Sequence, residues 1–98
     1  MSNQKKQVLQ YLISLPKNKV TTYKALAEKF STHPRAIATY MRTNTELDAY
    51  PCYKVVAHDG GLSGYVLWID EKIKRLTRDG VKIDAERVHE DYILRILD

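Results

Sequence analysis

Residues 20–42, with the sequence VTTYKALAEKFSTHPRAIATYMR, decide the fold of this chain. Thr21 or Thr22 can accept a hydrogen bond from the first turn of a helix that runs from Tyr23 to about Phe30. Pro34 suits the first position of the next helix, because the N–H group that proline lacks would have no partner there. Two short helices joined by a tight turn predict a helix-turn-helix with residues 34–42 as the recognition helix.

The segments on either side extend this unit into one small domain. Helical spacing of apolar residues predicts a helix over residues 3–15, and Asp70 can cap another over residues 71–78. Apolar runs predict strands at 55–57 and 81–83, and the spacing at 90–97 is helical again. After a turn at 58–61, residues 62–66 fit either a return strand or a loop. The predicted fold is α/β: a single winged helix-turn-helix domain over residues 1–98, mostly helical with a short β wing.

Positive charge is concentrated in the first half of the chain. Residues 1–44 hold eight Lys/Arg and one acid, Glu28, which is a formal charge of +7. Residues 45–98 hold eight Lys/Arg and eleven acids, a charge of −3, so that the whole chain carries +4. This asymmetry favours a polyanion partner on the N-terminal side, although a solvated basic surface gives the same pattern.

Composition argues against several other classes of protein. The hydrophobic fraction of 44% is that of a globular chain, and no apolar run has the length of a membrane span. No apolar segment follows the basic residues near the N-terminus, so we expect no signal peptide, no membrane partner and a cytoplasmic location. A single cysteine forms no internal disulfide, and the three histidines stand at no ligand spacing, so we expect neither a metal nor a cofactor.

The one cysteine, Cys52, stands at a rigid point of the chain. Pro51 has a fixed φ and biases Tyr50 toward an extended backbone, and the apolar run after Cys52 predicts a buried strand. A thiol held at such a corner is a candidate nucleophile, but only as the thiolate, and a free cysteine has a pKa of about 8.5. The alternative is that Cys52 serves as a small buried apolar residue.

Seven short motifs follow one another along residues 5–83. They are VTTYKALA at 20–27, PRAI at 34–37, RTN at 42–44, PCYKVV at 51–56, DG at 59–60, GY at 64–65, and the run KIKRL at 72–76 with DG at 79–80. Each motif is weak by itself, but the ordered set at these spacings is specific. It resembles the C-terminal, DNA-binding domain of the alkylguanine-DNA alkyltransferases, also called methylated-DNA–protein-cysteine methyltransferases.

That resemblance implies a DNA repair protein whose partner is double-stranded DNA containing alkylated guanine. The damaged nucleotide would be flipped out of the duplex, and its alkyl group would move irreversibly to Cys52. Asn44 would tie the recognition helix to the active-site loop, and Tyr65 would donate a hydrogen bond to the leaving guanine. The implied catalytic residues are Cys52, Tyr53, Asp79, Tyr65 and Asn44.

The resemblance also implies a DNA-binding set. Arg35 would fill the gap left by the flipped base, which agrees with the need for a side chain to occupy the hole after a base is extruded. Tyr23 would crowd the phosphate beside the target. The implied DNA-binding residues are Tyr23, Arg35, Lys54, Thr22 and Ala36. Without the resemblance, Tyr23 is compatible with a core aromatic and Arg35 with an ordinary surface arginine.

The sequence departs from the family pattern around the cysteine. The family motif is Pro-Cys-His-Arg, in which the histidine acts through water as the base, but Tyr53 and Lys54 follow Cys52 here. A phenol with a pKa of about 10 is a poor base at neutral pH. The thiolate would then depend on Lys54, on backbone dipoles, or on a relay from Tyr53 to Asp79, which stands where the family has glutamate. Residues 66–68 also replace the usual glycine pair after Tyr65.

Three functions are compatible with these features. The retained Cys52 favours a monomeric, single-turnover enzyme, a methylated-DNA–protein-cysteine S-methyltransferase. Tyr53 and the short chain favour a non-enzymatic alkyltransferase-like lesion sensor, which binds alkylguanine and recruits other repair factors. A winged-helix DNA-binding protein of another kind is the third possibility.

Overall fold

The helix-turn-helix predicted for residues 20–42 is present in the computed structural model, which describes residues 4–46, 49–62 and 69–97. Its two helices are α2 (Tyr23–Lys29) and α3 (Pro34–Arg42), and Pro34 begins α3 as predicted. The Thr22 hydroxyl accepts a hydrogen bond from the Ala25 N–H at 2.9 Å and so caps α2. This cap satisfies one of the N–H groups that the first turn of a helix leaves without a backbone partner.

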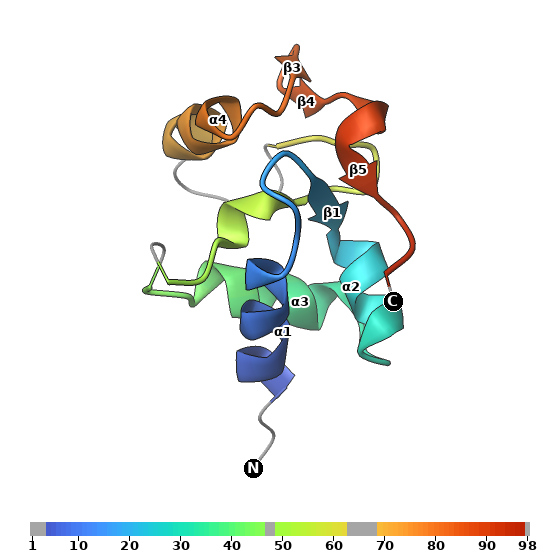
Figure 1. Cartoon of the computed structure of the whole chain (residues 1–98). Helices are drawn as coiled ribbons and strands as arrows, with labels where there is room; N and C mark the ends of the chain where they lie inside the picture. Colours follow the sequence, from blue (N-terminus) through green and yellow to red (C-terminus); the bar gives the residue numbers. More distant parts are fainter. Residues whose placement is uncertain (1–3, 47–48, 63–68, 98) are drawn as a thin grey trace.

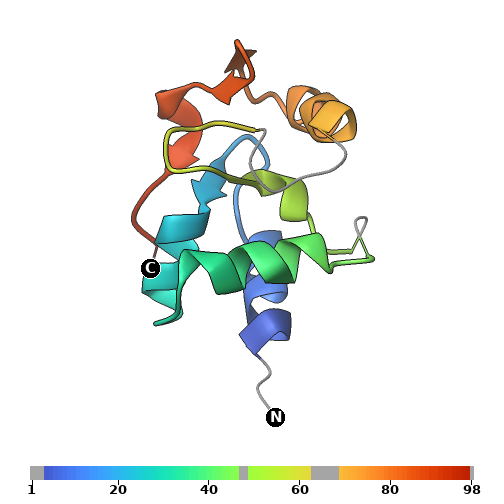
Figure 2. The same ribbon diagram turned by 180° about the vertical axis from the view of Figure 1, so that it is seen from behind.

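The recognition helix α3 is held by apolar contacts with α1 and α2. The N-terminal helix α1 spans Gln4–Ile13, close to the predicted range, and crosses behind α3 in the view of Figure 2. Val8 and Leu12 of α1, Leu26 of α2 and Ile37 of α3 are completely buried in one cluster. Burying four aliphatic side chains of this size stabilises the arrangement by several kcal/mol, at about 1.5–3 kcal/mol for each.

A three-stranded parallel sheet joins segments that are far apart in the sequence (Figure 1). β1 (Val20–Thr22) lies in its centre, with β2 (Val55–Val56) on one side and β5 (Ile93–Leu94) on the other. The strand predicted at 55–57 is therefore present, but it pairs with β1 in the register Thr21 to Val55. It does not form a hairpin with Leu62, whose N–H donates to the Glu86 carbonyl, and residues 63–66 lie outside the described residues.

The antiparallel element of the domain comes later in the chain. β3 (Ile83–Asp84) pairs with β4 (Arg87–Val88), and the predicted strand at 81–83 is thus shifted toward its C-terminal end. Ala85 and Glu86 connect the two strands with positive φ angles of 52° and 59°. Two consecutive residues in this conformation make the tight connection whose twist matches that of paired strands.

The prediction of a helix over residues 90–97 is wrong. Glu90–Tyr92 form a single 3-10 turn, and the chain then continues into β5. Ile93 pairs with Val20 of β1, and the Thr21 hydroxyl donates to the Leu94 carbonyl at 2.8 Å. The free edge of β1 offers backbone partners over the whole strand, whereas an isolated helix of eight residues is marginal, so tertiary pairing prevails over the helical spacing.

The last helix, α4 (Ile69–Arg78), packs against the 3-10 helix of residues 52–54 and lies at the end of the molecule opposite α1–α3 in Figure 1. It ends as predicted, because Gly80 adopts a φ of 88° that a residue with a side chain would adopt only with strain. Leu76 of α4 packs with Tyr53, Val56 and Leu62 in a second apolar cluster. The described part of the chain contains no helix with the length and apolar character of a membrane span.

The cap of α2 can be tested by a change that keeps the shape of the side chain. Thr22→Val should lower the free energy of unfolding by about 1 kcal/mol, because the Ala25 N–H loses its acceptor in a buried setting. Chemical denaturation of both proteins measures this difference. Thr77→Val, at an exposed position of α4, is the control and should leave the stability nearly unchanged. Equal losses in the two variants would contradict the role of Thr22.

Candidate active site

Cys52 opens a short 3-10 helix, Cys52–Lys54, directly after Pro51. Its N–H donates to the Tyr50 carbonyl at 2.8 Å, so the backbone turns sharply before the cysteine. The side chain is only 3% exposed and belongs to the apolar cluster formed with α1 and α3. The thiol therefore has a defined position but little contact with water.

Burial raises the pKa of the Cys52 thiol, because an apolar surrounding disfavours the thiolate. Four features act in the opposite direction: a hydrogen bond from the Asn44 side chain, the positive charge of Lys72, a backbone hydrogen bond at Cys52 and the positive charge of Arg75. Burial is the largest of these effects. The charges and hydrogen bonds around Cys52 thus favour the thiolate, but the burial of the Cys52 thiol disfavours it more strongly.

Asn44 links the end of α3 to the segment that precedes the cysteine. Its amide group donates to the Tyr50 carbonyl at 3.0 Å, and its carbonyl oxygen accepts from the Glu46 N–H at 3.0 Å. The same side chain hydrogen-bonds to the Cys52 thiol. Asn44, two residues after the end of α3, therefore connects the recognition helix to the segment that carries the thiol.

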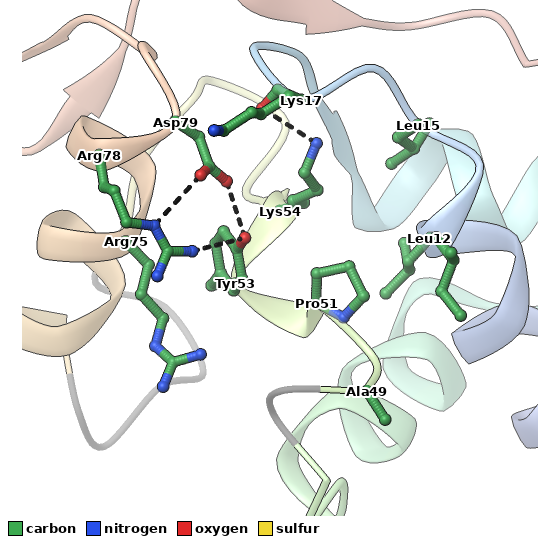
Figure 3. A pocket seen from close by; sticks show the side chains of 11 residues that line it. Leu12, Leu15, Lys17, Ala49, Pro51, Tyr53, Lys54, Arg75, Arg78 and Asp79 are labelled. Atoms are coloured by element: carbon green, nitrogen blue, oxygen red, sulfur yellow. Dashed lines mark hydrogen bonds and ion pairs between the residues drawn. The ribbon is translucent and has the colours of Figure 1, made fainter.

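Tyr53 and Asp79 form a buried pair on the side of the corner that faces α4 (Figure 3). The Tyr53 hydroxyl donates to the Asp79 carboxylate at 2.7 Å, and Arg78 pairs with the other carboxylate oxygen at 3.3 Å. Burial and the neighbouring carboxylate raise the pKa of Tyr53. At neutral pH Tyr53 thus keeps its proton and gives its hydrogen bond to Asp79, which makes it unsuited to accept a proton from Cys52.

Lys54 is turned into the protein, and this position does not fit the DNA contact implied by the sequence. Its side chain is 4% exposed, and its ammonium group donates to the carbonyl groups of Pro16, Lys17 and Lys19. These carbonyls belong to the turn between α1 and β1. Lys54 therefore holds that turn against the 3-10 helix, and it is absent from the charges that act on the thiol.

A different lysine, Lys72, is the cation with the larger effect on the thiol pKa, and sequence reasoning did not single it out. It is 1% exposed, it projects from α4, and its ammonium group donates to the Val55 carbonyl at 2.6 Å. Burial lowers the pKa of Lys72 to about 8, while the neighbouring Cys52 acts in the opposite direction. The sequence does indicate that Lys72 is buried, because it stands three residues after Ile69 and four before Leu76, on the apolar face of the helix.

A pocket of about 490 Å³ opens between α1 and α4 beside the cysteine (Figure 3). Its walls include Leu12, Pro51 and Tyr53, with the cations Arg75 and Arg78 at the side of α4. Cys52 itself does not line it. This pocket therefore reaches the tyrosine–aspartate pair but not the sulfur. Tyr65, which the family resemblance implies as the hydrogen-bond donor to the leaving guanine, lies outside the described residues.

The other implied DNA-binding residues differ in exposure. Arg35 is exposed in the first turn of α3, and Ala36 beside it is half-buried. Tyr23 and Thr22 are buried, Tyr23 in the apolar cluster and Thr22 as the cap of α2. Arg35 therefore has the position of a surface contact, whereas Tyr23 and Thr22 fit the packing and capping roles that their spacing also allows.

Comparison with known proteins places this geometry in context. Residues 3–81 match the model of a family described as 6-O-methylguanine DNA methyltransferase, DNA binding domain. A bifunctional methyltransferase/endonuclease of Picrophilus torridus is 43% identical over 84 residues, which are 80% of this chain and 28% of that protein. A methylated-DNA–protein-cysteine methyltransferase of Pyrobaculum aerophilum is 39% identical over 72 residues, 74% of this chain and 49% of that protein. The chain thus spans about half, or less, of the length of these relatives.

Two solved structures share the fold. The O6-methylguanine-DNA methyltransferase of Pyrococcus kodakaraensis superposes with a TM-score of 0.73 at 35% identity, over 83% of this chain and 48% of that one. S. pombe Atl1, solved in complex with damaged DNA containing O6-carboxymethylguanine, superposes with a TM-score of 0.82 over 96% of both chains. At 19% identity, this second likeness concerns the fold alone.

Proposed function

The chain belongs to the family of 6-O-methylguanine DNA methyltransferase DNA-binding domains, and from this premise we propose that it binds alkylated guanine in double-stranded DNA and transfers the alkyl group to Cys52. The observation that carries the proposal is the position of Cys52. The thiol follows Pro51 at a sharp turn, and Asn44, just after the recognition helix, is hydrogen-bonded to the segment that precedes the cysteine. A lesion-binding protein without transfer would need no thiol at this point.

The proposed reaction balances without a cofactor. The Cys52 thiolate attacks the alkyl carbon on O6 of guanine, a C–S bond forms, and the C–O bond breaks with its electron pair left on the base. The guanine then takes one proton, which replaces the proton lost by the thiol. The thioether product does not regenerate a thiol, so each molecule reacts once. Most of the acceleration would come from holding carbon and sulfur in attack geometry.

Access to the base requires that the nucleotide leave the stack. Extrusion costs a few kcal/mol, and a side chain that enters the duplex offsets part of this cost. Arg35 has the exposure and the place at the start of α3 that such a role requires. In this proposal α3 lies against the DNA, and Asn44 at its C-terminal end connects that contact to the thiol.

One observation favours a second function, binding of the lesion without transfer. Burial raises the pKa of Cys52, and Tyr53, which follows it in place of the family's histidine, is committed to Asp79 at 2.7 Å. If no group compensates, the thiol stays protonated at neutral pH and the protein acts as a lesion sensor. The two functions share the DNA contact and differ only at the sulfur.

The mass of the intact protein separates these functions. The protein is incubated with a duplex oligonucleotide containing one O6-methylguanine, and it should gain the mass of one methylene group on the peptide that contains Cys52. Cys52→Ser should bind the same duplex with similar affinity and gain no mass. Tight binding of the wild-type protein without a mass change, at every pH up to the ionisation of the thiol, would establish the sensor instead.

The role of Arg35 has a specific signature. Arg35→Ala should weaken binding to duplex DNA with O6-methylguanine about tenfold more than it weakens binding to the same lesion in a single strand, because a single strand has no stack to repair. Fluorescence anisotropy with both substrates measures the two losses. Arg42→Ala, an equal change of charge at the exposed other end of α3, should weaken both similarly. Equal losses for Arg35→Ala would make it an ordinary phosphate contact.

A further inference from the structure

Lys72 is the largest of the completely buried side chains in the described part of the molecule. Its ammonium group donates to the Val55 carbonyl at 2.6 Å, and no carboxylate of residues 4–46, 49–62 or 69–97 forms an ion pair with it. A buried cation without an anion is costly, and natural proteins retain such groups mostly at functional sites. Among the carboxylates that the structure describes, none supplies an anion for Lys72.

The position of Lys72 indicates which group supplies that anion. The Val55 N–H donates to the Cys52 carbonyl and closes the 3-10 helix, while the Val55 carbonyl accepts from Lys72. Lys72 is therefore bonded to the same short corner that carries the thiol, and the Cys52 sulfur and the Lys72 ammonium interact electrostatically in the interior. In a medium of low dielectric constant, such an interaction is far stronger than in water.

We propose that Lys72 is the positioning cation that allows Cys52 to ionise. Such a cation is needed because Tyr53 stands where the family has a histidine base. This inference rests on the proposed function and specifies how its thiolate forms. The thiol proton leaves to water, the thiolate forms beside the ammonium group, and the displaced guanine takes a proton from water. Lys72 ends the reaction as the ammonium group with which it began.

The other groups around the thiol do not replace Lys72. Helices α1 and α3 present apolar side chains to Cys52, and Asn44 contributes a neutral hydrogen bond. Arg75 is the second cation that acts on the sulfur, but its guanidinium group pairs with Glu71 at 2.8 Å, which offsets part of its charge. With the pKa of Lys72 at about 8, the ammonium form predominates at neutral pH.

The thiol pKa of the DNA-free protein tests this assignment. Thiolate formation is followed by absorbance at 240 nm against pH, with Cys52→Ser as the blank, in the wild-type protein and in Lys72→Met and Lys72→Gln. Both variants remove the charge, and the glutamine retains a donor for the Val55 carbonyl. Both should raise the thiol pKa by about one unit or more, which is about tenfold less thiolate at neutral pH. Lys74→Met, at an exposed position of the same helix, should leave it unchanged.

The outcomes separate the possible failures. An unchanged thiol pKa in the glutamine variant would overturn the proposal, even if the methionine variant shifts, because the effect would then come from the backbone contact. If Lys72→Met does not fold, Lys72→Gln carries the measurement. Because the titration uses no DNA, a shifted pKa in a protein that fails to accept a methyl group would overturn the proposed function and not the role of Lys72.

Discussion

Affinity for DNA should fall by about three orders of magnitude between roughly 50 and 200 mM salt, as expected for a protein that contacts about six phosphates. The eight cations of residues 1–44 carry this expectation, because the structure describes all of them and none is buried. Lys24, Arg35 and Arg42 are exposed on the helix-turn-helix itself. Phosphate contacts of this kind bind any sequence, and under the proposed function they would bring the recognition helix to the duplex before the lesion is found.

Fluorescence anisotropy with an undamaged duplex over a series of salt concentrations measures this dependence. Arg42→Ala should reduce the slope of log affinity against log salt by about one, the loss of one phosphate contact. Lys82→Ala removes an equal charge at an exposed position of the acidic second half, and it should leave the slope unchanged. An affinity that does not change with salt would exclude an electrostatic DNA interface on the N-terminal half.

Lys72→Met should be more stable than the wild-type protein by about 2 kcal/mol at pH 7. An ammonium group buried where its pKa falls to about 8 lowers the free energy of unfolding by about 3 kcal/mol, because the unfolded chain hydrates it fully. The variant removes this cost but leaves the Val55 carbonyl without its donor, which costs about 1 kcal/mol. Replacement of buried charges by apolar residues of similar size often stabilises proteins by this amount.

The stability gain predicted for Lys72→Met should decrease as the pH rises. The folded pKa of Lys72, about 8, lies below that of the unfolded chain, so the unfolded state binds more protons between pH 8 and about 10. The cost is fully present below pH 8 and is relieved as the pH rises. The advantage of Lys72→Met in urea denaturation should therefore be largest at pH 7 and should shrink above pH 8. If the stability advantage of Lys72→Met over the wild-type protein were the same at pH 7 and at about pH 10, Lys72 would not be a buried ammonium group.

The gain in stability and the rise in thiol pKa predicted for Lys72→Met together describe a site in which stability is exchanged for function. A lysine that lowers stability in the free protein is expected where its charge serves a reaction. Loss of the thiolate in Lys72→Met, together with a gain in stability, is the signature that a merely structural lysine would not produce. A structural lysine, such as Lys54 with its three carbonyl partners, has its contacts complete in the resting protein.

The helices could be predicted well because their signals are local. The cap at Thr22, Pro34 at the start of α3 and Gly80 after α4 act within a few residues of their own position, and each lies where the sequence indicates. The strands could not be predicted equally well. The pairing of β2 and β5 with β1 depends on segments more than thirty residues apart, and residues 90–97 carry a helical spacing that the free edge of β1 overrides.

The sequence by itself determined the helix-turn-helix, the basic first half and the cysteine at a proline corner, because residue order and composition specify all three. Only the tertiary structure decided which lysine acts on that cysteine. Lys54 stands only two residues after Cys52 in the sequence, but the 3-10 turn directs its side chain toward the carbonyls after α1. Lys72 is twenty residues away in the chain, and packing of α4 brings its charge to the sulfur, because electrostatic interaction depends on distance in space and on burial.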